Sequence, residues 1–387
     1  MSFSYRLSAA LIAATIASVQ PELAVAQLSA QQVEEIDINQ CNPSGEIDFN
    51  EAIRLNPNDA EAYNGRGAVR YDRGDIQGAI GDYNEAIRLN PSYADAFNNR
   101  ALARYDQGDI QGALADYNEA IRLAPNDADA YYNRAFVRSK QGDIEGAIAD
   151  YNEAIRLTPN EAKAYNYRGF VRSQQGDIEG AIADYNEAIR LAPNYVEAYS
   201  NRGFVRSQQG DKQGAVADYN EAMRLNPSYG KVYGNRGYSR SQQGDIQGAI
   251  ADFNEFIRLD PNDAKAYNYR GYLRLQQGDR QGAIADYNEA IRLDPKYADA
   301  YYDRGYFRYD QGDKQAALAD YNEAIRLDPN HADAYYNRAL VRNEQRDIQG
   351  AINDFQKASE LYQQQGNTDS YRDAQNAIIE LQKELEV

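Results

Sequence analysis

Apolar residues recur along this chain with a helical spacing that is interrupted at regular intervals. In the segment IQGAIGDYNEAIRL, residues 76–89, apolar side chains fall three and four positions apart and define one face of a helix. The preceding segment AEAYNGRGAVRYDR, residues 60–73, shows a similar spacing of small and aromatic residues. The pattern therefore predicts two helices, over 60–73 and over 76–89.

Turn residues separate the predicted helices. Gly74 suits the left-handed residue just past a helix end, and Asp75 can cap the next helix. Pro91 ends the second helix because proline lacks an N–H and disfavours helix in the preceding residue. Ser92, after the proline, is expected to cap the following helix. Arg346 stands where a later copy should have glycine, which predicts a strained or frayed turn.

The whole pattern repeats without insertion or deletion. Prolines 34 residues apart mark the copies, and they are Pro57, Pro91, Pro125, Pro159, Pro193, Pro227, Pro261, Pro295 and Pro329. A fixed period of this size is typical of a solenoid, in which each repeat packs only on its neighbours. The chain is therefore predicted to be all-α.

The 34 positions of each copy are counted from its first residue, which is Ala60 in the first copy. Several positions are nearly constant among the copies: Tyr or Phe at position 4, Gly or Ala at 8, Gly at 15, Ala at 20, Tyr or Phe at 24, Ala at 27 and Pro at 32. This pattern resembles the tetratricopeptide repeat, and it recurs nine times over residues 60–365. The resemblance implies a right-handed superhelical solenoid of helix-turn-helix repeats, whose first helices line a concave groove that binds peptides. Arg66 and Arg70 depart from the family pattern, and we expect them to pair with Asp82 and Glu85.

The amino-terminal segment has the features of a targeting sequence. Residues 1–26 combine a positive charge at Arg6, an apolar run over 7–19 and an Ala-Val-Ala site ending at Ala26. These features predict a secretory signal peptide cut before Gln27. The alternative, an uncleaved membrane anchor, needs a longer apolar run. The mature chain is therefore predicted to be periplasmic or secreted, without membrane insertion after cleavage.

The repeats are flanked by two further segments. Residues 27–59 are interpreted as an amino-terminal cap that contains a degenerate half repeat. Residues 366–387 have an apolar stripe and are interpreted as a helix that caps the last repeat. The alternative for this helix is docking of a partner helix.

The composition of the chain limits the classes of function that it can have. The net charge of −18 repels phosphate backbones, so we expect no nucleic-acid binding and favour a protein or peptide partner with a neutral or basic segment. The single Cys41 and the single His331, expected in a turn, do not supply a usual metal site. A catalytic site needs distinctive residues placed once, whereas the other polar residues recur in copies. No enzymatic activity, cofactor or metal is predicted.

Positions that vary among the copies concentrate along one face of the first helix. Aromatic residues occupy position 9 in six consecutive copies, as Phe136, Phe170, Phe204, Tyr238, Tyr272 and Tyr306. Aromatic rings give a large contact area at low entropic cost and suit a binding surface. Alternatively, each ring packs against the adjacent repeat.

Asparagine recurs at position 6 of the same helix. The residues are Asn99, Asn133, Asn201, Asn235 and Asn337. The series is similar to the asparagine ladder of O-linked N-acetylglucosamine transferases, whose side chains hold a peptide backbone, since an amide both donates and accepts. Other residue types interrupt the series, and a solvated polar face is the alternative.

These features together predict an exported, non-enzymatic scaffold that binds a partner segment along the groove of the superhelix. The alternative is a structural solenoid that associates weakly with copies of itself.

Overall fold

The structure is a computed structural model that describes residues 49–385. These residues divide into two compact units, 49–205 and 206–385, with the boundary inside helix α11. Every regular element of the described residues is an α-helix, which confirms the all-α prediction.

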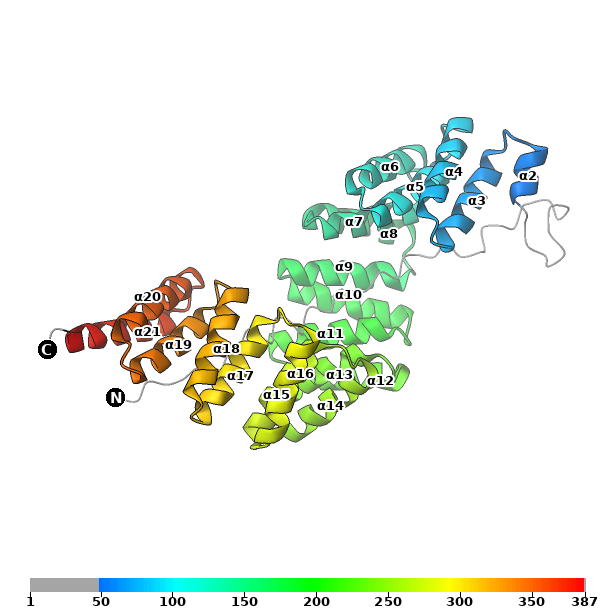
Figure 1. Ribbon diagram of the computed structural model, residues 1–387. Coiled ribbons are helices and arrows are strands. Elements are labelled where there is room, and N and C mark those ends of the chain that lie inside the picture. The colour runs from blue at the N-terminus through cyan, green and yellow to red at the C-terminus, as the bar shows by residue number, and fades with distance from the viewer. Residues whose placement is uncertain (1–48, 386–387) are drawn as a thin grey trace. The chain divides into compact units, whose positions relative to one another are not determined.

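The helices follow one another in pairs along the chain (Figure 1). In the unit 49–205 they are α2 (Phe49–Leu55), α3 (Ala60–Asp72), α4 (Ile76–Leu89), α5 (Ala94–Gln107), α6 (Ile110–Leu123), α7 (Ala128–Lys140), α8 (Ile144–Leu157), α9 (Ala162–Gln175), α10 (Ile178–Leu191) and most of α11 (Val196–Gln209). In the unit 206–385 they are α12 (Lys212–Leu225), α13 (Gly230–Ser241), α14 (Ile246–Leu259), α15 (Ala264–Gln277), α16 (Arg280–Leu293), α17 (Ala298–Asp310), α18 (Lys314–Leu327), α19 (Ala332–Glu344), α20 (Ile348–Gln364) and α21 (Thr368–Leu385).

The second helix of each repeat begins at an aspartate and buries one face. In α4 the Asp75 carboxylate accepts a hydrogen bond from the Gly78 N–H at 2.9 Å, which satisfies a backbone donor of the first turn. Ala79, Tyr83 and Ala86 of the same helix are buried. The helix spans the predicted residues, 76–89.

The prediction that Ser92 caps α5 is wrong, because the N-cap residue is Tyr93 and its side chain makes no cap hydrogen bond. Where a first helix does have a side-chain cap, as α3, α7, α9, α15 and α19 do, the capping residue lies one position later than predicted. In α3 the side chain of Asp59 accepts a hydrogen bond from the Ala62 N–H at 3.0 Å. Pro57 and Asn58 are the two central residues of a turn that the Asp59 N–H closes onto the Asn56 carbonyl at 3.2 Å. The residue after the proline therefore lies inside the turn, and the next residue is the first that can cap the helix.

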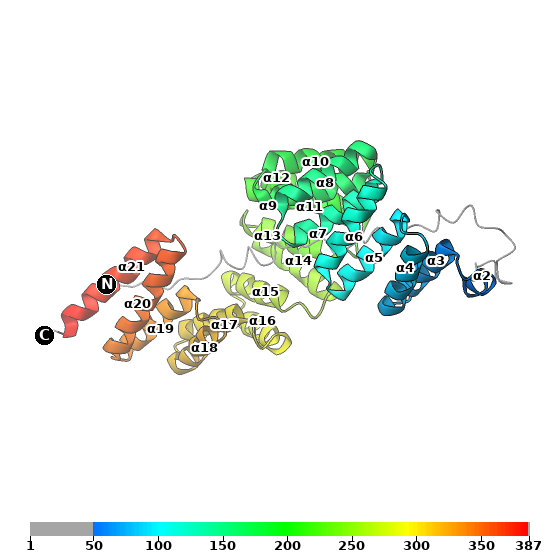
Figure 2. The same ribbon diagram turned by 90° about the horizontal axis from the view of Figure 1, so that it is seen from above.

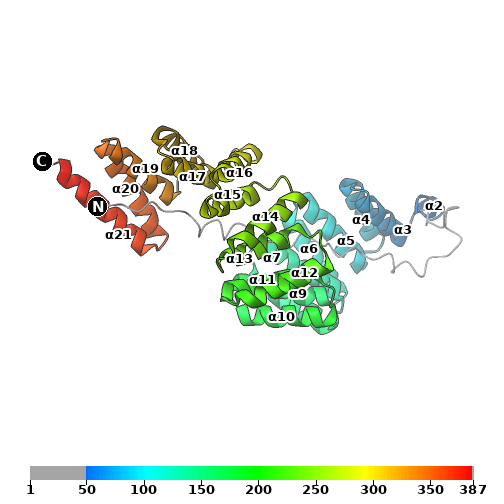
Figure 3. The ribbon, with the colours of Figure 1, turned by 90° about the horizontal axis from the view of Figure 1, so that it is seen from below.

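The two helices of a repeat approach closely where one of them carries glycine. A Cβ atom added at Gly67 would lie 2.6 Å from the ring of Tyr83, which is itself only 2% exposed. The ring of the second helix thus occupies the space that a side chain of the first helix would need. Paired helices lie side by side in this way, as Figures 1 and 3 show for α15 and α16.

The last two helices form a longer pair. Helix α21 packs along α20 (Figure 2) and buries Ala374, Ala377, Ile378 and Leu381 in the core that it shares with α19 and α20. At the other end of the described chain, α2 packs against α3. The predicted signal peptide, 1–26, and the first part of the predicted cap lie outside the described residues.

Within residues 49–385, none of the helices combines the length and apolar character needed to span a bilayer.

The turn between α19 and α20 adopts the glycine conformation without a glycine. Arg346 has a φ of 66°, whereas the equivalent glycines have φ values from 79° to 90°. The turn is nevertheless closed, because the Asp347 N–H donates to the Arg342 carbonyl at 2.9 Å. The turn is therefore strained, as left-handed backbone disfavours a residue with a Cβ atom, but it is not frayed.

We expect Arg346→Gly to raise the free energy of unfolding of the C-terminal repeats by about 1 kcal/mol, because it removes that strain. The matched control is Gly278→Arg, which introduces the same strain at an equivalent turn where a Cβ atom meets nothing within 4 Å. Urea unfolding followed by circular dichroism measures both changes. A less stable Arg346→Gly variant would show that the arginine side chain stabilises the turn.

Candidate partner-binding face

Side chains at positions 5, 6, 9 and 13 of each first helix share one side of that helix, which we call the first-helix face. In α9 these positions are Asn166, Tyr167, Phe170 and Gln174. The face contains every residue that the sequence proposed for partner binding, but the structure gives those residues different surroundings.

The phenylalanines of this face lie partly in the core of the unit 49–205. Phe136 is only 7% exposed, and its ring meets those of Tyr105 and Tyr167 edge-on, with centroids 5.7 and 6.2 Å away. Phe170 and Phe204 are half-buried and pack against the cores beneath them. Packing therefore buries most of the Phe136 ring, whereas the rings of Phe170 and Phe204 keep exposed surface.

The tyrosines of the unit 206–385 are half-buried. Tyr238, Tyr272 and Tyr306 each retain exposed surface. The ring of Tyr269, at 2% exposure, packs against both Tyr238 and Tyr272, with its centroid 5.9 Å from each. Burial raises the pKa of the Tyr238, Tyr272 and Tyr306 hydroxyls. All three hydroxyls thus stay protonated at neutral pH and can donate hydrogen bonds.

The asparagines at position 6 lie between repeats. Asn99, Asn201, Asn235 and Asn337 are buried, and Asn133 is half-buried. Side-chain amides of this series donate to position 5 of the preceding repeat: Asn99 to Asn64 at 3.0 Å, Asn133 to Asn98 at 3.3 Å, Asn201 to Asn166 at 3.1 Å and Asn337 to the Tyr302 hydroxyl at 3.1 Å. The alternative of a solvated polar face is wrong for the buried members. Peptide binding by these amides stays a prediction, since they hold neighbouring repeats together in this structure.

The exposed amides of the first-helix face are glutamines at position 13. Gln174, Gln208, Gln242 and Gln276 are exposed, and each follows an aromatic residue by four positions. Gln276 Nε2 donates to the Tyr272 hydroxyl at 2.6 Å. Sequence reasoning missed these residues, although their spacing from the aromatic series placed both on one side of the helix.

Carboxylates gather near the start of the first helices in the unit 49–205. Burial raises the pKa of Asp95, and the neighbouring Asp127 adds to the rise. Burial also raises the pKa of Asp129, with further contributions from Asp127, Glu161 and Asp95. Carboxylates that raise one another's pKa share a negative potential, which attracts cations.

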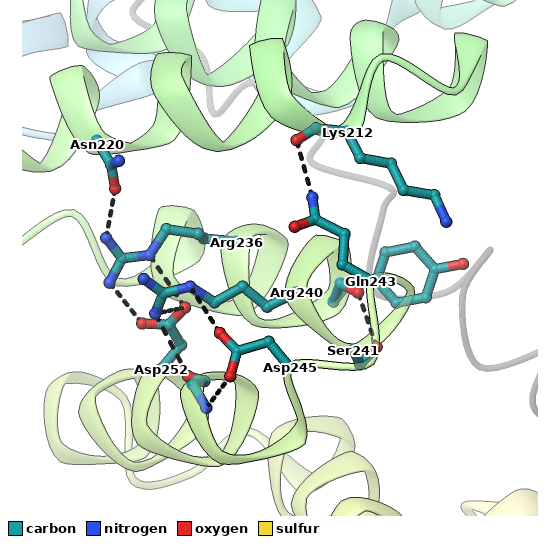
Figure 4. A network of polar contacts seen from close by, with 10 residues as sticks. Lys212, Asn220, Arg236, Arg240, Ser241, Gln243, Asp245 and Asp252 are labelled. Carbon is teal, nitrogen blue, oxygen red and sulfur yellow. Dashed lines mark hydrogen bonds and ion pairs between the residues drawn. The ribbon is translucent and has the colours of Figure 1, made fainter.

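The recurring arginines are used within the fold. Asp252 of α14 accepts hydrogen bonds from Arg236 Nε at 3.0 Å and from Arg240 Nη1 at 2.9 Å (Figure 4). Arg236 Nη1 also donates to Asn220 Oδ1 of the preceding repeat at 2.6 Å (Figure 4). The arginines therefore join the two helices of a repeat and connect consecutive repeats.

One of the two predicted arginine partners is confirmed and the other is wrong. Arg66 and Arg70 pair with Asp82, at 2.7 and 2.8 Å. Glu85 instead pairs with Arg88 at 2.6 Å on the exposed side of its own helix. The two residues are one helical turn apart, so their contact forms without help from the first helix.

The side chain of His331 contributes to the fold. It caps α19, where its Nδ1 accepts a hydrogen bond from the Ala334 N–H at 3.2 Å, and its Nε2 lies 3.3 Å from Asp299 Oδ1. Among residues 49–385, no group of three or more His, Cys, Asp or Glu side chains is arranged to hold a metal ion. Cys41 lies outside the described residues.

Helix pairs that repeat in register, with a variable first-helix face, define a helical-repeat solenoid. Family models described as TPR repeat match residues 67–108, 101–142, 137–176, 171–210 and 305–345. Models described as tetratricopeptide repeat match residues 196–229, 235–298, 286–319 and 332–365. The chain therefore belongs to the tetratricopeptide-repeat family, whose members bind protein or peptide partners.

Two solved structures share this fold, and a third is similar to part of the chain. The APC/C hetero-tetramer Cut9–Hcn1 has a TM-score of 0.53 at 16% identity, over 86% of this chain and 80% of that one. A tetratricopeptide repeat protein from Parabacteroides merdae ATCC 43184 has a TM-score of 0.51 at 21% identity, over 65% of this chain and 96% of that one. MamA is 27% identical over 43% of this chain and 96% of its own length, with a TM-score of 0.39. The first two likenesses show the fold alone. None of the curated proteins matches this chain.

Proposed function

We propose that this chain is an exported, non-enzymatic scaffold whose first-helix face binds a segment of a partner protein. The observation that carries the proposal is the series of half-buried aromatic residues at position 9 of consecutive repeats. These rings keep exposed surface on the face where the repeats differ most, whereas the second helices are nearly identical. Aromatic rings that keep exposed surface at repeated positions are typical of binding surfaces.

The charge of the chain favours a neutral or basic partner segment. The net charge is −18, and Asp95 and Asp129 add a local negative potential on the first helices. Such a surface repels acidic segments and accelerates association with basic ones. Export is supported by the apolar run and the Ala-Val-Ala site of residues 1–26.

Site-specific photo-crosslinking tests the proposal. A photoreactive residue in place of Gln276, exposed on the first-helix face, should capture a partner protein in an extracytoplasmic extract. The same residue in place of Gln281, exposed on the second helix of the same repeat, is the matched control and should capture far less. Mass spectrometry of the adduct identifies the partner. If it also shows that this protein begins at Gln27 in the adduct, the result would support export.

Equal capture from the two positions would contradict binding on the first-helix face. Capture of nothing but a second copy of the chain would replace the proposal with the self-associating solenoid.

A further inference from the structure

Three half-buried tyrosine rings that keep exposed surface occupy equivalent positions in consecutive repeats of the unit 206–385. Tyr238 of α13, Tyr272 of α15 and Tyr306 of α17 occupy the same position of their repeats, and we call them the tyrosine row. Helices α15 and α17 contact each other directly. Because the axes of packed helices lie roughly 8–10 Å apart, the row advances by about that distance per repeat.

Ring contacts give an independent limit on this spacing. The centroid of Tyr269 is 5.9 Å from those of both Tyr238 and Tyr272, so the rings of Tyr238 and Tyr272 are at most twice that distance apart. One turn of a polyproline II helix contains three residues and advances by about 9 Å. A peptide in this conformation therefore repeats its side chains at an interval that matches the spacing of packed helices and lies within the limit set by the ring contacts.

Exposed amides accompany the rings. Gln242 and Gln276 each lie four residues after a tyrosine of the row and are exposed. Gln276 Nε2 donates one hydrogen bond to the Tyr272 hydroxyl, and its amide nitrogen carries a second N–H. A polyproline II backbone has no internal hydrogen bonds, so its carbonyl groups need external donors of this kind.

Charged groups beside the row are bound to other groups of the protein. Arg280 Nη2 pairs with Asp310 Oδ2 at 3.1 Å, and Lys212 Nζ donates to the Gln242 carbonyl at 2.7 Å. The row therefore presents aromatic rings, hydroxyls and amides, and these groups favour an uncharged ligand segment over a charged one.

We propose that the tyrosine row, together with Gln242 and Gln276, binds a proline-rich segment in the polyproline II conformation, with one turn of the ligand for each repeat. This inference rests on the proposed partner-binding function of the first-helix face and specifies the chemistry of the partner. Proline rings pack against the tyrosines, and the glutamines donate to the ligand carbonyls. The ligand loses little conformational entropy because proline already holds it in the bound conformation.

Fluorescence anisotropy with a labelled oligoproline peptide tests this inference. A peptide of about nine residues makes three turns and covers the row. It should bind the chain 27–387, and Tyr272→Ala should weaken binding by about tenfold or more because an anchoring ring is lost. Gln276→Glu, which keeps the rings and removes a donor, should weaken binding by about threefold or more.

Two controls accompany these variants. Tyr267→Ala removes a ring from the same helix that instead lies against Arg270, with the guanidinium carbon 5.3 Å from its centroid, and it should leave affinity unchanged. A glycine-serine peptide of equal length is flexible and should not bind. Circular dichroism confirms that each variant is folded. If Tyr272→Ala loses helicity, Gln276→Glu provides the decisive comparison.

The inference is overturned if the folded chain does not bind the proline peptide or binds the glycine-serine peptide equally well. It is also overturned if neither Tyr272→Ala nor Gln276→Glu weakens binding of the proline peptide. Capture of a partner at Gln276 without proline binding would leave the scaffold function standing and refute only the proline-rich ligand. Failure of both experiments would refute both.

Discussion

Replacing Asp286 with alanine should lower the free energy of unfolding by about 3–5 kcal/mol, because it leaves two arginines without their buried counter-charge. Asp286 is 3% exposed and accepts hydrogen bonds from Arg270 Nε at 2.9 Å and Nη2 at 2.6 Å, and from Arg274 Nη1 at 2.8 Å. Arg270 also donates to Asn254 of the preceding repeat at 2.8 Å. Loss of the carboxylate therefore weakens both the repeat and its junction.

The matched control is Glu289→Ala on the same helix. Glu289 pairs with Arg292 at 2.6 Å, and the exposed position of this pair means that its loss should change stability very little. Urea unfolding followed by circular dichroism compares the variants, and hydrogen exchange of α15 and α16 shows whether the loss is local. Equal effects of the two substitutions would show that the buried carboxylate contributes no more than a surface charge.

Stability of the C-terminal repeats should fall as pH rises from about 5 to about 8, through a buried polar cluster at their junctions. Asp303 is 1% exposed and accepts a hydrogen bond from Asn268 Nδ2 at 2.7 Å. Burial raises its pKa to about 7, Asn268 and His331 oppose the rise, and Asp299 and Asp333 add to it.

The linkage for Asp303 has a definite sign. Its pKa is raised in the folded state, so the folded protein holds a proton that the unfolded chain releases at lower pH. The resulting stability is fully present below the unfolded pKa and is lost as pH rises through about 7. Above that pH the buried charge costs on the order of a few kcal/mol.

His331 adds a dependence of the same sign. Burial lowers its pKa, but the hydrogen bond and charge of Asp299, together with Asp333 and Asp328, outweigh burial and raise it. A histidine with a raised pKa stabilises the fold below its unfolded pKa and loses that contribution as pH rises through the folded value. Both groups therefore favour the folded repeats at acidic pH.

The variant Asp303→Asn should remove most of this dependence. It should stabilise the protein at about pH 8 and change little at about pH 5, because the amide cannot ionise. The new amide can also donate to Asn268 Oδ1, which has no hydrogen-bond partner among the described residues. Thermal unfolding at the two pH values measures the difference. Asp310→Asn, an exposed change on the same helix, should act alike at both. An unchanged pH profile in Asp303→Asn would place the dependence elsewhere.

The repeating elements could be predicted because each boundary has a local cause. Local residues determine the backbone geometry at both ends of α4, and these residues are Gly74, Asp75 and Pro91. The predicted helix 76–89 therefore has the observed ends. The cap of α3 is Asp59 and not the residue directly after the proline, because Pro57 and Asn58 suit both a turn and a cap. Closure of that turn by the Asp59 N–H decides between them.

The surroundings of the candidate site could not be read in the same way. The variation of position 6 among the copies suggested that these residues are not needed for packing between repeats. The structure instead pairs them with position 5 of the neighbouring repeat, as Asn99 pairs with Asn64. The two residues of such a pair are 35 residues apart in the sequence and occupy different positions of their repeats. A comparison of one position among all copies therefore does not reveal the contact between them. Exposure of Gln242 and Gln276 beside half-buried tyrosines depends on packing between repeats, which periodicity does not specify.

One contact has a consequence for how the gene can change. An arginine at position 7 donates to an asparagine of the preceding repeat at nine junctions, from Arg66 and Asn50 to Arg338 and Asn322. Recombination that removes or duplicates one 34-residue copy would join two surfaces that already carry this pair. The length of the array, and with it the extent of its binding face, can therefore change in a single genetic event that keeps this pair at every junction.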